Sequence, residues 1–133
     1  MVLSVLTLSH ALSYPITIYH GIAHGHAVTL TLVRFFLLIL IIRKIIDKRG
    51  LKYLSEVMDE LFQLFGKSNA AKCEVMQYRL MHDIGLETNL TKLGIRSSYS
   101  INRIVKSVNI QRLRNNPIEI NKHVIYSSLK EMI

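Results

Sequence analysis

Histidine is the residue type in this sequence best suited to chemistry, and four of the six histidines lie at positions 10, 20, 24 and 26. Neutral imidazole is a good ligand for iron, zinc or nickel, although two imidazoles alone make an incomplete site. His10 and His24 are fourteen residues apart, a spacing that does not place them on one helical face. They can converge if His10 ends one helix, His24 starts the next, and the loop between them folds back.

Other pairings of these histidines stay open on spacing alone. His20 and His24 are four residues apart, but Gly21 disfavours a helix between them. His24 and His26 would face apart on a helix. Ordinary hydrogen-bonded histidines at helix ends are the alternative to any metal site.

The elements that must position these residues are helices. Tyr14 and Pro15 are expected to break the first helix, and Gly21 and Gly25 to loosen the approach to the second. Apolar residues at steps of three and four then predict helices near 24–46, 51–65, 69–84, 99–114 and 121–131. The sequence therefore predicts an all-α bundle of five or six helices.

Several details of these helices are also predicted. Gly66 and Gly85 are expected to end two of them, and Pro117 to lie beyond a third. The expected N-caps are Ser68, Ser98 or Ser100, and Asn121. The expected buried face of helix 69–84 consists of Val75, Met76, Leu80 and Ile84.

Composition limits the function classes. The chain has 133 residues with 17 Lys and Arg against 9 Asp and Glu, a net charge of +8 that invites anionic partners. The single cysteine, Cys73, excludes an internal disulfide and agrees with a reducing cytoplasm. The six glycines are isolated, so the sequence has no glycine-rich phosphate loop.

The apolar run at 27–46 raises two alternatives from other classes. It is about long enough to span a bilayer, which would make the chain a small basic membrane protein, but Arg34 interrupts it. A helical nucleic-acid-binding module would instead use Arg103, Lys106, Arg112 and Arg114 as a phosphate-contacting stripe. That stripe lacks a recognition motif, and we expect neither a membrane nor a nucleic acid as partner.

Three segments together resemble the C-terminal domain of the iron-containing (group III) alcohol dehydrogenases. The first is HALSYP at 10–15 followed by GIAHGHAV at 21–28, and the sequence of these segments is most similar to the branch that reduces phosphonate aldehydes such as phosphonoacetaldehyde. The second is LMHDIGLETNLTKLGI at 80–95, and the third is the Asn116-Pro117 pair before the last helix. The resemblance covers residues 8–133 and implies a dehydroquinate-synthase-like α-domain.

The resemblance also implies roles for individual residues. The family holds one divalent metal, usually iron, with one Asp and three His, and the last two of these match His10 and His24. Tyr14 falls where many members have a further active-site histidine beside the substrate, so a phenol would serve there. Ala23 stands where the family usually has proline, and His20 and His26 match no ligand position.

The activity that the resemblance implies is NAD(P)-linked hydride transfer to or from a small alcohol or aldehyde, and the most similar branch implies a substrate that bears a phosphonate. The cofactor domain and the other two metal ligands lie upstream in that family. We therefore expect residues 1–133 to be a single partial domain, from a truncated or frameshifted gene or a genuine small protein, and to be inactive alone. Fe²⁺ is the expected metal, with Zn²⁺ as an alternative. We also expect self-association through apolar surface in residues 1–46.

Overall fold

The computed structural model describes residues 7–41, 48–66 and 69–133, and these form seven α-helices with no strand among them. The all-α class is confirmed. The described residues form seven helices rather than five or six, because the predicted helix at 99–114 is divided into two. The helices are α1 (Thr7–His20), α2 (His24–Ile41), α3 (Gly50–Leu64), α4 (Ala70–Asp83), α5 (Ser98–Ser107), α6 (Ile110–Leu113) and α7 (Lys122–Lys130).

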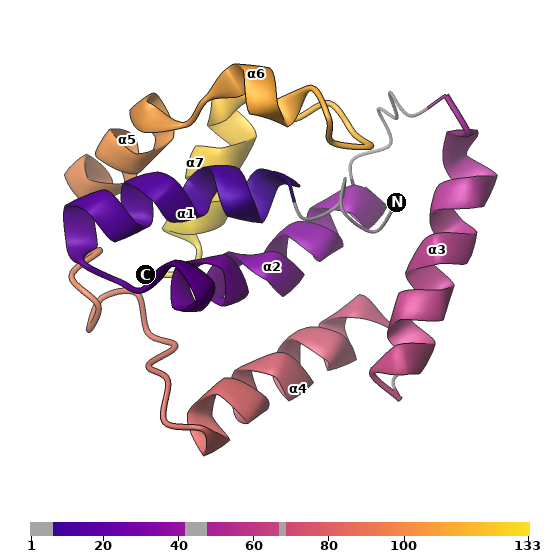
Figure 1. Ribbon diagram of the computed structural model, residues 1–133, viewed down its shortest axis with the longest axis horizontal. Helices are drawn as coiled ribbons and strands as arrows, with labels where there is room; N and C mark the ends of the chain where they lie inside the picture. The colour runs from indigo at the N-terminus through magenta and orange to yellow at the C-terminus, as the bar shows by residue number, and fades with distance from the viewer. Residues whose placement is uncertain (1–6, 42–47, 67–68) are drawn as a thin grey trace.

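Helix α1 lies at the centre of the arrangement (Figure 1). It packs against α2 on one side and against α5 and α6 on the other, while α7 packs against α5 and α4 packs against α2. Helices α3 and α4 form the outer edge of the molecule in this view. The histidine-rich segment is therefore part of the best-packed region of the fold.

The prediction that Tyr14 and Pro15 break the first helix is wrong. Helix α1 continues through Pro15, which is itself buried. A proline inside a helix costs about 3 kcal/mol, whereas each fully buried leucine or isoleucine contributes roughly 1.5 to 3 kcal/mol. Leu8, Leu12 and Ile16 recur at four-residue steps and are all at most 1% exposed. Burial of this apolar stripe outweighs the local cost of Pro15.

The predicted helix at 99–114 is interrupted between α5 and α6. Val108 is extended, with ψ at 127°, and the Asn109 side chain accepts a hydrogen bond from the Gln111 backbone N–H at 3.0 Å. Asn109 is thus a helix N-cap that the apolar periodicity concealed. The N-cap of α5 is Ser97, not Ser98 or Ser100, whereas Asn121 caps α7 as expected.

The predicted buried face of α4 is also wrong. Val75, Leu80 and Ile84 are 69%, 55% and 65% exposed, and Met76 is partly buried. The buried side chains are instead Ala70, Cys73, Gln77 and Met81. Helix α4 has apolar residues on two faces, and the face toward α2 is chosen by packing that includes a hydrogen bond from Gln77 to the Thr29 carbonyl at 2.6 Å. Its N-cap is Asn69, and the predicted cap Ser68 lies outside the described residues.

Helix α2 carries the apolar run that raised the membrane question. It extends to Ile41, and the rest of the predicted helix, 42–46, lies outside the described residues. Arg34 forms ion pairs with Glu74 of α4 and with Glu131 after α7, so its charge joins three parts of the fold. Within the described ranges, we find no helix with the length and apolar character needed to cross a membrane.

Candidate metal site at the start of α1 and α2

His10 and His24 converge in the structure. Their ring centroids are 5.5 Å apart, with the ring planes inclined by 33°, and both side chains are exposed. His10 lies in the first turns of α1 and His24 is the first residue of α2. The turn between the helices brings the two together, and Gly21 enters it with a left-handed φ of +67° that favours glycine.

Ser13 connects the two histidines. Its hydroxyl donates a hydrogen bond to the His10 carbonyl oxygen at 2.7 Å, and its Oγ lies 3.0 Å from His24 Nδ1. Ser13 itself is completely buried, and its two contacts with the exposed histidines are part-buried. No feature of the sequence pattern marked Ser13, because its contact with His24 joins two helices.

Tyr14 lies beside His24, on the outer side of the pair. The Tyr14 ring is 46% exposed, and its centroid is 5.5 Å from that of His24. The Arg112 guanidinium lies over the same ring, with its Cζ 4.6 Å from the centroid. A small cavity here is lined by Ala11, Tyr14, Ser107, Asn109 and Arg112. The sequence had marked Arg112 only as one charge in a basic stripe.

His20 lies at the other end of α1 from His10, and its surroundings differ. Its Nε2 is buried and has no hydrogen-bond partner among the described residues. Burial lowers the pKa of His20, and the nearby Arg103 guanidinium lowers it further. Arg103 itself lies 3.9 Å from the centroid of the Tyr19 ring. These surroundings favour the neutral form of His20.

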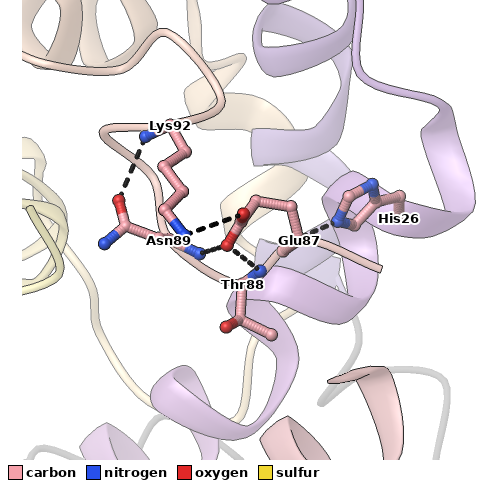
Figure 2. Close-up of polar contacts among 5 residues, drawn as sticks. All are labelled: His26, Glu87, Thr88, Asn89 and Lys92. Atoms are coloured by element: carbon pink, nitrogen blue, oxygen red, sulfur yellow. Dashed lines mark hydrogen bonds and ion pairs between the residues drawn. The ribbon is translucent and has the colours of Figure 1, made fainter. Parts of the chain in front are cut away.

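His26 is engaged in holding the segment after α4. Its Nε2 donates to the Glu87 carbonyl oxygen at 2.7 Å (Figure 2). The Glu87 carboxylate accepts from the backbone N–H groups of Thr88 and Asn89 and forms an ion pair with Lys92 at 3.5 Å. The Asn89 N–H bond is the main reason that the pKa of Glu87 is lowered. The His26 nitrogen that makes this contact is therefore occupied within the protein.

The separation of the two ring centres is compatible with a shared metal ion. With metal–nitrogen bonds of about 2.0 to 2.1 Å, two imidazoles on one tetrahedral ion have ring centres roughly 5 Å apart. The observed separation of 5.5 Å is close to this value. Across the described ranges, no three or more His, Cys, Asp or Glu side chains gather as a metal-binding group. The pair alone supplies two nitrogen donors.

The comparisons with known proteins support the resemblance at the level of the family. The model of the Fe-containing alcohol dehydrogenase family, C-terminal, matches residues 1–133. No match was found among curated proteins or among solved structures.

Proposed function

We propose that this chain, which belongs to the Fe-containing alcohol dehydrogenase family, supplies His10 and His24 as two ligands of one divalent metal ion. The reaction that we propose for the complete site is hydride transfer between NAD(P) and a small alcohol or aldehyde. The observation that carries the proposal is that the two imidazoles, one near the start of each of two helices, have ring centroids 5.5 Å apart. Iron is the proposed metal, with zinc as the alternative.

The residues of this chain have defined tasks in that reaction. When bound, the metal acts as a Lewis acid that polarises the substrate oxygen, and the nicotinamide carries the hydride. His10 and His24 would hold the ion at the open side of the α1–α2 turn, where both are exposed to substrate. Tyr14, 5.5 Å from His24, would pack against the substrate.

Residues 1–133 do not by themselves contain every part that the reaction needs. Two imidazoles are half of the family's ligand set, and no glycine-rich loop is present to hold the phosphates of NAD(P). Hydride transfer requires the reacting carbons to be held about 3 to 3.5 Å apart. We therefore propose that these residues alone have no dehydrogenase activity.

The position of Arg112 favours the hypothesis that the substrate carries an anionic group, such as a phosphonate. Its guanidinium is stacked on Tyr14, and Tyr14 contacts His24, so a positive charge borders the proposed metal site. Arginine binds phosphonate and carboxylate groups through two parallel N–H donors. We assign this charge to a small anionic substrate rather than to nucleic acid. Cys73 is the single cysteine of the sequence and is buried, which agrees with a reducing cytoplasm as the proposed location.

Metal titration tests the ligand assignment. We expect Zn²⁺ or Fe²⁺, added under anaerobic conditions in the case of iron, to bind weakly to the purified chain by calorimetry. His10→Ala or His24→Ala should lower the affinity at least tenfold, or about 1.4 kcal/mol. His82→Ala is the matched control, because the His82 side chain is 87% exposed and lies on α4.

Equal affinity in His24→Ala and His82→Ala would refute the ligand assignment. In the same preparations, NAD(P)H absorbance should not change with short alcohols or phosphonoacetaldehyde. Metal-dependent oxidation of NADH that disappears in His24→Ala would refute the proposal that these residues alone are inactive.

The proposal that Arg112 binds an anionic group of the substrate has a separate test. Methylphosphonate should shift the NMR signals of Tyr14 in the wild-type chain, and Arg112→Gln should abolish the effect. Arg114→Gln is the control, since Arg114 follows the same short helix and is also exposed. Loss of binding in both variants would indicate general charge attraction instead of a site at Arg112.

A further inference from the structure

We infer that Ser13 is a positioning residue that sets the proton of His24 on Nδ1 and leaves Nε2 free to bind a cation. The inference rests on the proposed function, because it gives Nε2 of His24 a use as a ligand atom. Its own basis is the hydrogen-bond geometry around one buried hydroxyl.

A hydroxyl group has a single proton, and that of Ser13 is already assigned. The His10 carbonyl oxygen, 2.7 Å away, has no proton and can only accept. The Ser13 hydroxyl therefore donates to this carbonyl. Toward His24 Nδ1, at 3.0 Å, the same oxygen can only accept. His24 must supply the proton, so its neutral form carries hydrogen on Nδ1.

The consequence is an unprotonated Nε2 on the opposite edge of the imidazole ring. A ring nitrogen without a proton is the form that binds a metal, and a fixed bond at the other nitrogen also limits rotation of the ring. The two contacts of Ser13 join the backbone at His10 to the ring of His24. Ser13 thus holds the His24 ring against the turn of α1 that carries His10.

Ser9 provides a matched control within the same helix. It lies one turn before Ser13 and is likewise buried, at 1% against 0% exposure, but its hydroxyl is without a hydrogen-bond partner in the described part of the chain. Serine to alanine at either position removes one buried hydroxyl from α1. Only the change at Ser13 removes a contact with His24.

The tautomer is measured directly by long-range ¹H–¹⁵N correlation of a chain labelled at histidine, at a pH where His24 is neutral. We expect Nδ1 of His24 to be protonated in the wild type, in Ser9→Ala and in Ser13→Thr, and His24→Gln to identify the signal. In Ser13→Ala the proton should distribute between both nitrogens. The Zn²⁺ affinity should fall about tenfold in Ser13→Ala, a loss typical of groups that support metal ligands, and stay unchanged in Ser9→Ala.

Protonation of Nε2 in the wild-type chain would overturn the inference, and this measurement does not depend on whether Ser13→Ala folds. Equal spectra and equal Zn²⁺ affinities for Ser13→Ala and Ser9→Ala would also overturn it. Failure of the proposed function is a different result. In that case the tautomer would be as inferred, but His24→Ala would leave the Zn²⁺ affinity unchanged.

Discussion

Replacing Gly21 by alanine should destabilise the chain by about 1 to 2 kcal/mol, because an L-residue in the left-handed region carries that backbone cost. Gly21 has a φ of +67° in the turn that joins α1 to α2. A Cβ built at this position meets no atom within 4 Å, so no steric clash adds to the cost. The magnitude therefore comes from backbone conformation alone.

Gly25 supplies the matched control four residues later. It lies in α2, is not among the glycines with positive φ, and its Cβ would also meet nothing within 4 Å. Gly25→Ala should therefore stabilise the fold by about 0.4 to 1 kcal/mol, mainly by restricting the unfolded chain. The same chemical change thus has opposite effects at two neighbouring positions.

Urea unfolding followed by circular dichroism measures both free energies, provided that the slope of the transition is unchanged. The two variants should differ by about 2 kcal/mol. If Gly21→Ala were as stable as the wild type, or if both variants shifted in the same direction, the left-handed turn between His10 and His24 would be refuted.

Two further predictions concern pH and association. The pKa of His20 is lowered in the folded chain, so the unfolded chain binds more protons, and the contribution of His20 to stability is complete above pH 6.5 and is lost as the pH falls below it. The decrease in Tm between pH 7.5 and 5.5 should therefore be smaller in His20→Gln than in the wild type. An equal decrease in the two proteins would contradict this prediction. The exposed apolar side chains of Val75 and Leu80 on α4 and of its C-cap residue Ile84 should promote self-association. Val75→Glu should lower the sedimentation coefficient at high concentration and reduce binding of a hydrophobic dye, and a wild-type chain that stays monomeric without binding dye would contradict the prediction.

The helices that the sequence predicts well are those whose apolar residues lie on one face. Helix α5 lies within the predicted range 99–114, and it buries Ile101, Ile104 and Val105 at three- and four-residue spacing. Helix α4 shows why periodicity can mislead. Its apolar residues occupy two faces, and the choice between them depends on the contact of Gln77 with Thr29 of α2, which no local pattern contains.

Some residues of the candidate site could likewise be predicted from the sequence, and others could not. Spacing left several histidine pairs open, and the family resemblance selected His10 and His24, the pair that the structure brings together at 5.5 Å. Ser13 and Arg112 complete the surroundings through contacts between helices. Their residue types are common on helices, so their roles become visible only once α1, α2 and α6 are placed.

The two backbone features that the sequence misjudged are also the two that build this site. Because α1 continues through Pro15, the face that begins at His10 extends past Tyr14 to Ile18, and Tyr14 and Ile18 line a hollow together with His24. Because Asn109 starts a new helix after the extended Val108, the chain changes direction and places Arg112 over the Tyr14 ring. If α5 continued without a break, Arg112 would lie about 7.5 Å beyond Ser107 along the axis of α5, because the rise is about 1.5 Å per residue over five residues. An unbroken first helix and a broken later one therefore bring the histidines, the phenol and the guanidinium to one edge of the fold.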